Sequence, residues 1–352
     1  MRFFSFVLLF VFNSCLTIAQ GDLTPSEYRH DPLKVKCYTL ENGLKVFLTE
    51  NHDSPKVFGA VVVKAGGKTD PAYATGMAHY LEHMLFKGTT TLGTTDYEKE
   101  KLHLDSINVL YEELGKTKDE TKRKELQKKI NQVSVRAAQY AIPNEMDRML
   151  TEIGGEDVNA FTSLEMTVYH NSFPASQIER WLAIYAHRFQ NPVFRLFQSE
   201  LETVYEEKNI GMDDPMESLF EKFMENFYKV HPYGQQTIIG TTEHLKNPSL
   251  KTMYEYFDTY YVPNNMALVI SGDIIPEEII PIINEKFGKW KSKTVPGFSE
   301  FKETEFNGTE KVRVRYTPIK VGALGFRTPA NSNEDYIAVD IISNMLSNGD
   351  GG

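Results

Sequence analysis

The sequence predicts an α+β fold. Hydrophobic residues make up 41% and charged residues 24% of its 352 residues, which is the ordinary composition of a globular protein. Strand patterns gather in a few places along the chain, and long stretches whose apolar residues have helical spacing separate them. Strands and helices that come in separate runs are typical of α+β proteins.

The strand patterns begin with a β-hairpin. Residues 35–40 and 44–49 flank Glu41-Asn42-Gly43, and Asn-Gly between two apolar runs is a strong signal for a tight turn. Further strands are predicted where β-branched and other apolar residues gather, at residues 57–64, 158–162, 166–171 and 266–271.

Helices are predicted at about residues 75–86, 197–210, 216–229, 249–261 and 276–289. Ser176 and Glu179 have the spacing of a capping box, which predicts one more helix that runs to about Phe189. Residues 96–141 are rich in Lys, Glu and Gln and carry two apolar stripes, which predicts a helical hairpin. We assign this hairpin no chemistry.

The first 20 residues have the pattern of a secretory signal peptide. Arg2 precedes an apolar stretch, residues 3–12, which is too short to span a bilayer and is followed by small and polar residues. Cys15 offers an alternative, a lipid anchor, although the residues before it fit a lipidation motif poorly. Both readings predict an exported protein, periplasmic or secreted, and no later segment predicts a transmembrane span.

Composition excludes some classes of site and partner. The net charge is −10 and no basic run stands out, which argues against nucleic acid as a partner. Cys15 and Cys37 are the only cysteines. A mature chain without the signal peptide therefore has no internal disulfide and no thiolate-rich metal site.

His79, Glu82 and His83 carry the chemistry, in the order His-x-x-Glu-His within a predicted helix. Residues four apart lie on one helix face, so both histidines can bind one ion with Glu82 beside it. Catalytic zinc takes three protein ligands and keeps one water, whose proton a nearby carboxylate can accept. Two unrelated surface histidines are the alternative, but apolar neighbours on this helix predict burial, and buried histidines need a partner.

The third ligand is predicted in the carboxylate-rich helix that begins near Glu200. Glu200 and Glu207 are seven residues apart and share a face, so one could bind the metal while the other orients a histidine. The residues alone do not choose among Glu200, Glu202, Glu206 and Glu207.

These motifs resemble the pitrilysin/insulinase family of zinc metallopeptidases. Residues 76–89 are similar to the metal helix of that family, which carries the inverted zinc motif. Gly154-Gly155 and residues 159–162 are similar to its substrate-binding strand, and Glu200 with Glu207 fits its glutamate helix. The resemblance runs from about Pro32 to the end of the chain. It implies a mixed sheet covered by helices and cleavage of peptide bonds.

The resemblance also implies roles for individual residues. His79, His83 and Glu207 would hold Zn²⁺, Glu200 would support a histidine, and Glu82 would activate a zinc-bound water. The expected function is a zinc-dependent endopeptidase that hydrolyses peptides or unfolded polypeptide segments.

The expected substrate site is the strand that contains Asn159 and Ala160. In the family, the matching residues line a sheet edge to which an extended peptide can add as a further strand. An ordinary edge strand is the alternative.

The domain organisation follows from the same resemblance. We expect a zinc-bearing domain at residues 33–291, with residues 96–141 as an insertion, because Glu207 follows His83 by more residues than in the family. A polar linker would follow at 292–304, and residues 305–352 would begin a second, similar lobe with a strand pair at 312–326 and a helix at 333–346. A strand pair and one helix cannot bury both faces of a sheet, so we expect an N-terminal fragment of a longer protein.

Two other functions remain open at this point. The chain could be a non-catalytic peptide-binding or partner subunit of a peptidase pair, or a scaffolding protein that uses the hairpin at residues 96–141. A C-terminal half or a partner subunit is expected to complete the substrate chamber.

Overall fold

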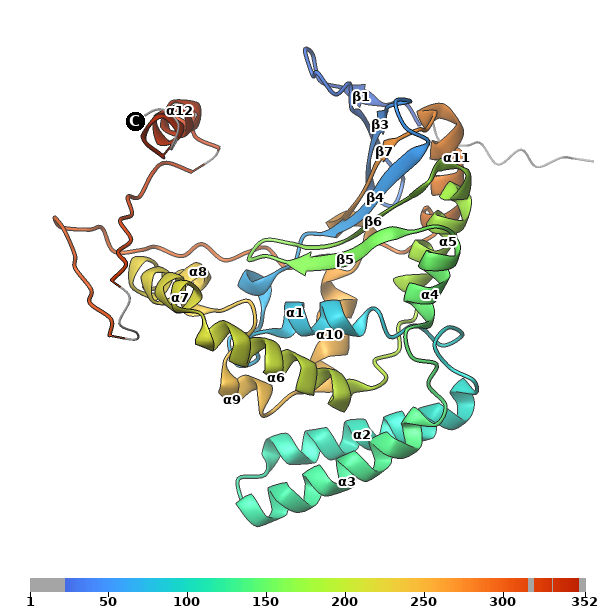
Figure 1. Cartoon of the computed structure of the whole chain (residues 1–352), viewed down its shortest axis with the longest axis vertical. Helices are drawn as coiled ribbons and strands as arrows, with labels where there is room; N and C mark the ends of the chain where they lie inside the picture. Colours follow the sequence, from blue (N-terminus) through green and yellow to red (C-terminus); the bar gives the residue numbers. More distant parts are fainter. Residues whose placement is uncertain (1–22, 316–319, 331, 348–352) are drawn as a thin grey trace, which may run out of the picture.

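The computed structural model describes residues 23–315, 320–330 and 332–347 (Figure 1). The predicted signal peptide and Cys15 lie outside these residues.

A mixed sheet forms the centre of the fold, as the sequence predicts. Its strands follow the order β1-β2-β3-β7-β4-β6-β5. The predicted hairpin is β2 paired antiparallel with β3, and only the pairing of β3 with β7 is parallel. The strands are β1 (Ser26–Glu27), β2 (Lys36–Thr39), β3 (Lys45–Glu50), β4 (Lys56–Val63), β5 (Glu156–Thr162), β6 (Thr167–Pro174) and β7 (Met266–Gly272).

Helices lie along one side of this sheet and below it (Figure 1). They are α1 (Met77–Met84), α2 (Tyr97–Lys116), α3 (Glu120–Ala138), α4 (Glu145–Glu152), α5 (Ile178–Arg188), α6 (Phe197–Asp213), α7 (Pro215–Phe227), α8 (Pro232–Gln235), α9 (Thr242–Leu245), α10 (Leu250–Tyr260), α11 (Pro276–Phe287) and α12 (Tyr336–Ser347). In the described part of the chain, no helix has both the length and the apolar character that a bilayer span requires.

The core lies between the helices and one face of the sheet. In β4, Val57 and Val61 are buried, whereas Phe58 on the opposite face is 42% exposed. Trp181 of α5 packs against this sheet so closely that a Cβ at Gly59 would lie 2.4 Å from its ring. The Trp181 indole N–H donates to Asn171 Oδ1 on β6 at 2.8 Å, which fixes α5 on the sheet.

The helical pair predicted at residues 96–141 is present as α2 and α3 (Figure 1). A buried ion pair ties it to the body. Glu100 on α2 is fully buried and accepts hydrogen bonds from Arg195 Nε at 2.9 Å and Nη2 at 3.2 Å. The other N–H groups of Arg195 bind the carbonyl oxygens of Lys87, Thr89 and Leu92, in the segment that follows α1. The pair therefore holds α2 against the end of the metal-motif helix.

The predicted capping box is wrong. A 3₁₀ turn, Ala175–Gln177, precedes α5, and the residue at the helix N-cap is Gln177, without a side-chain cap bond. Since β6 ends at Pro174 and the chain turns at once, Ser176 lies within the turn.

The strand pair predicted at residues 312–326 is also wrong, because the described residues of this segment form no strand. Val312 and Val314 are exposed, and no neighbouring strand in the described residues offers them hydrogen-bond partners. The segment is held at its end, where Arg327 Nη2 donates to the Phe227 carbonyl of α7 at 2.7 Å. The helix predicted at 333–346 is present as α12.

Candidate metal centre and substrate edge

The metal-motif helix α1 begins at a buried carboxylate. Asp70 accepts hydrogen bonds from the backbone N–H groups of Gly76, Met77 and Ala78 at 2.7, 3.2 and 2.8 Å. The first N–H groups of a helix have no partner within the helix, and the Asp70 oxygens supply acceptors for them. Burial raises the pKa of Asp70 to about 8, although these three hydrogen bonds lower it in part. Gly76 itself has φ 87°, and a Cβ would lie 2.6 Å from the Ile239 carbonyl. These contacts fix the position from which α1 presents its side chains.

Three side chains converge beside α1 to form a group that could hold a metal ion: His79, His83 and Glu207. The two Nε2 atoms are 3.3 Å apart. Glu207 Oε2, on α6, lies 3.6 Å from His79 Nε2 and 3.4 Å from His83 Nε2. No other such group occurs in the residues that the structure describes.

The spacing of these atoms fits zinc. Ligand atoms about 2.0–2.1 Å from a tetrahedral zinc ion are about 3.3 Å from one another, close to the separations in this site. Burial, together with a smaller effect of the nearby His83, lowers the pKa of His79 to about 4. His79 is therefore neutral near pH 7, the form that binds metal. Among the residues that the structure describes, none is a hydrogen-bond partner of the buried His79 Nδ1.

Glu200 and Lys87 support His83 from the side away from the metal group. Glu200 Oε1 lies 2.9 Å from His83 Nδ1, and Glu200 Oε2 lies 2.5 Å from Lys87 Nζ. A proton on Nδ1 leaves the lone pair of Nε2 for the metal. Burial raises the pKa of Glu200, but the hydrogen bonds from His83 and Lys87 outweigh it and the pKa is lowered. Glu200 is thus kept as an acceptor.

Glu82 lies on the same helix and is 7% exposed. Its Oε2 accepts a hydrogen bond from Thr162 Oγ1 on β5 at 2.5 Å. Burial raises the pKa of Glu82, whereas the Thr162 hydroxyl, His83 and Arg188 lower it in part. A carboxylate with a raised pKa next to a metal site is suited to accept and return a proton.

Asn159 and Ala160 lie on β5, the outermost strand at one end of the sheet, against which α1 packs. Ser163 N–H donates to the Met166 carbonyl across the tight turn. Since hydrogen-bonded and non-hydrogen-bonded pairs alternate in an antiparallel ladder, the backbone groups of Ala160 and Thr162 face the open side of β5. Asn159 Oδ1 accepts the outward Ala160 N–H at 2.9 Å.

The sequence-predicted residues thus lie together, with α1 between the glutamate helix and the edge strand. Glu206 and Glu202, which the residues alone left open, are not part of the metal group. Sequence reasoning missed Lys87 and Thr162, although both lie within the quoted motifs. Asp70 was also missed, and its only signal is an acidic residue shortly before a helix.

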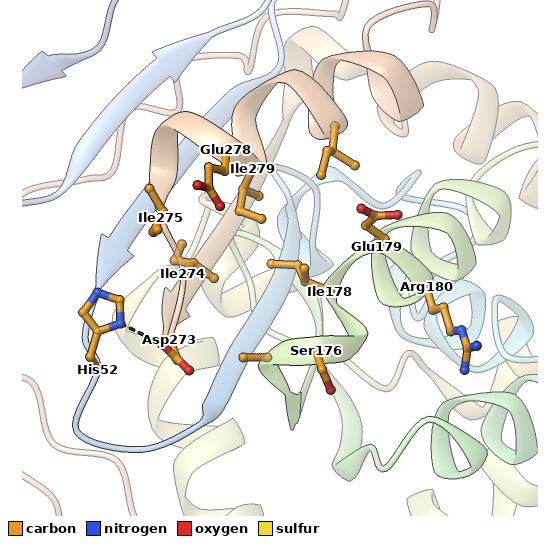
Figure 2. Close-up of a pocket in the computed structure, with 12 residues that line it drawn as sticks. His52, Ser176, Ile178, Glu179, Arg180, Asp273, Ile274, Ile275, Glu278 and Ile279 are labelled. Atoms are coloured by element: carbon orange, nitrogen blue, oxygen red, sulfur yellow. Dashed lines mark hydrogen bonds and ion pairs between the residues drawn. The ribbon is translucent and has the colours of Figure 1, made fainter.

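The pocket shown in Figure 2 is a different place. It has a volume of about 630 Å³, lies between α5 and α11, and has an isoleucine-rich floor. His52 and Asp273 lie at its edge and are joined by a hydrogen bond of 2.6 Å. None of the predicted site residues lines it.

Comparison with known families gives two matches. Residues 45–105 and 117–241 match the family described as insulinase, peptidase family M16. Residues 249–352 match the domain described as the peptidase M16 inactive domain.

Curated relatives include zinc proteases. The zinc protease PqqE of Helicobacter pylori is 24% identical over 325 residues, which cover 90% of this chain and 62% of that protein. The beta subunit of the mitochondrial-processing peptidase of Dictyostelium discoideum is 22% identical, with 96% of this chain and 62% of that protein covered. The chain therefore spans about 62% of the length of these relatives.

Solved structures share the fold. A protease from H. pylori has a TM-score of 0.58 at 22% identity, with 76% of this chain and 53% of that chain covered. The periplasmic protease PqqL of Escherichia coli has a TM-score of 0.59 at 18% identity, with 79% of this chain and 26% of that chain covered. With the family match over more than half of its residues, the chain belongs to the insulinase family of peptidases, M16.

Proposed function

We propose that this chain is a zinc-dependent endopeptidase that hydrolyses peptides or unfolded polypeptide segments. The observation that carries the proposal is the convergence of two histidine nitrogens and one carboxylate oxygen, 3.3–3.6 Å apart, beside an open sheet edge. Family membership and zinc-protease relatives support a peptidase role.

In this proposal His79, His83 and Glu207 hold Zn²⁺, and Glu200 orients His83. When bound, zinc supplies a Lewis acid that lowers the pKa of water to about 7. The protein contributes two imidazoles and one carboxylate whose ligand atoms already lie 3.3–3.6 Å apart, so little reorganisation accompanies metal binding.

Glu82 is the proposed general base. Among the described residues, Thr162 is the only hydrogen-bond partner of its carboxylate, so Oε1 remains free to accept a proton from the attacking water. The same carboxylate can then return that proton to the leaving amine, which must be protonated before it departs.

Substrate would bind along β5. An extended peptide can pair with the outward N–H and C=O groups of Ala160 and Thr162, and Asn159 would release the Ala160 N–H to it. Pairing through the main chain tolerates many side chains. It requires an unpaired extended segment, which peptides and unfolded chains offer and folded domains do not.

We also propose that the chain is exported, periplasmic or secreted, with lipidation at Cys15 as the alternative, and that a C-terminal half or partner subunit completes the chamber. The first proposal rests on the pattern of residues 1–20, and a structural neighbour is described as periplasmic. The second is supported by the 62% share of the relatives that the chain spans.

The test is zinc content and cleavage of a quenched fluorescent peptide, measured on the same samples. Wild type is compared with Glu82→Gln and with Glu206→Gln, a matched change of a carboxylate outside the metal group. The proposal expects zinc in all three and cleavage in all but Glu82→Gln. Absence of zinc in the wild type would refute it. Zinc in all three samples with cleavage in none would call for the same measurement on a chain extended by the proposed C-terminal half, and no cleavage there either would favour the non-catalytic partner subunit.

A further inference from the structure

The proposed base is held by the substrate edge and not by its own helix. Thr162 Oγ1 lies 2.5 Å from Glu82 Oε2 and 3.4 Å from Thr167 Oγ1. The Thr167 hydroxyl donates its own proton to the Ala65 carbonyl at 2.9 Å, so it cannot donate to Thr162. The single hydroxyl proton of Thr162 therefore goes to the nearer, charged acceptor, Glu82.

Thr162 faces two partners at once. Its side chain points toward α1, because it bonds Glu82 there. Ser163 and Met166 form a hydrogen-bonded pair, so the next pair of the ladder, Thr162 and Thr167, is a non-hydrogen-bonded one. The backbone N–H and C=O of Thr162 therefore face the open side of β5. One residue thus joins the edge to which a peptide would add and the carboxylate that would act on it.

We propose that Thr162 is a positioning residue that fixes the Glu82 carboxylate relative to the bound peptide strand. This inference rests on the proposed function, since it assigns Thr162 to the same site. The hydroxyl occupies Oε2 and leaves Oε1 for the water. Because the peptide would pair with the backbone of Thr162 and the Thr162 hydroxyl binds Glu82, the carboxylate and the scissile bond are held at a fixed distance from each other.

Loss of the hydroxyl frees the Glu82 side chain to rotate. A displacement of about 1 Å in a reacting group can cost about 100-fold in rate. Thr162→Val keeps the branched shape of the side chain and the backbone of β5 while removing the donor. We expect kcat to fall about 10-fold to 100-fold, with KM little changed because the peptide still pairs with the backbone.

The experiment measures kcat, KM and zinc content for Thr162→Val and Thr162→Ser. The serine variant keeps the hydroxyl and should recover most of kcat. Thr39→Val is the matched control, since Thr39 is also on a strand and its hydroxyl accepts a hydrogen bond from Lys45 far from the site. Zinc content should be the same in all variants, because Thr162 is not in the metal group.

Crystal structures of zinc-loaded wild type and Thr162→Val supply a readout that does not need activity. We expect the Glu82 carboxylate to move in the valine variant. The proposal is overturned if kcat stays within about twofold of wild type, if serine fails to recover the rate, or if the carboxylate keeps its place. Wild type that binds zinc but never cleaves would instead sink the proposed function, and the carboxylate position would still decide the role of Thr162.

Discussion

Replacing Glu100 by alanine should destabilise the whole fold that holds the candidate metal centre. Arg195 has five N–H donors, and all five are paired: two with Glu100, two with the carbonyls of Lys87 and Leu92, and one with that of Thr89. Glu100→Ala leaves two of these donors without an acceptor and the guanidinium charge without a counter-ion, at a position where both side chains are at most 2% exposed.

Breaking such a buried pair from one side costs about 3–5 kcal/mol, a large part of the roughly 5–15 kcal/mol that stabilises a typical domain. Urea unfolding followed by tryptophan fluorescence measures this loss, with buried Trp181 as a reporter of the core. Asp105→Ala is the control, because Asp105 lies on the same helix in an exposed ion pair with Lys101, and it should change stability far less.

A loss for Glu100→Ala below about 1 kcal/mol, the size of an ordinary hydrogen bond, would show that Arg195 finds other partners and would refute the reasoning. The result also decides how the role of the helical pair can be studied. Deletion of residues 96–141 removes Glu100 as well, so lost activity after that deletion would report misfolding and not a scaffolding function.

Three further predictions concern the metal centre. Lys87→Met should weaken zinc binding about 10-fold to 100-fold, since it frees Glu200, whereas Lys87→Arg should keep most of the affinity. Competition with a chromogenic chelator measures both affinities, and a Lys87→Met variant that binds zinc as tightly as wild type would argue against the support of His83 by Glu200. Asp70→Ala should lower the free energy of unfolding by about 1–2 kcal/mol through loss of the α1 cap, and Asp70→Asn should lower it less; equal urea midpoints for all three proteins would contradict the cap. Removal of zinc by EDTA should lower the thermal midpoint, because a ligand at 100 times its Kd stabilises by about 2.7 kcal/mol; an unchanged midpoint would mean that the native chain carries no structural or catalytic zinc.

The sequence predicts the elements of the site better than the contacts between them. Asn-Gly marks the β2–β3 hairpin, and the His-x-x-Glu-His spacing marks a helix with one metal-facing side. Both depend on neighbours within a few residues. The capping box at Ser176 failed because the end of β6 at Pro174, set by pairing with distant β4, decides where the chain turns.

Long-range contacts explain the rest. Glu200 and Glu207 share a helix face, but only packing of α6 on α1 puts one carboxylate at Nδ1 of His83 and the other at Nε2. Thr162 reaches Glu82 across 80 positions of sequence, so no local spacing signals the hydrogen bond. The burial of Glu100 is likewise invisible in a segment that is charged throughout.

Zinc stoichiometry of the purified wild-type chain tests the central claim most directly. After dialysis against a small excess of zinc and then metal-free buffer, elemental analysis should find about one zinc ion per chain, and Glu207→Gln prepared in parallel should hold much less. A wild-type chain without bound zinc, or a Glu207→Gln chain that holds as much as wild type, would contradict the metal centre built from His79, His83 and Glu207.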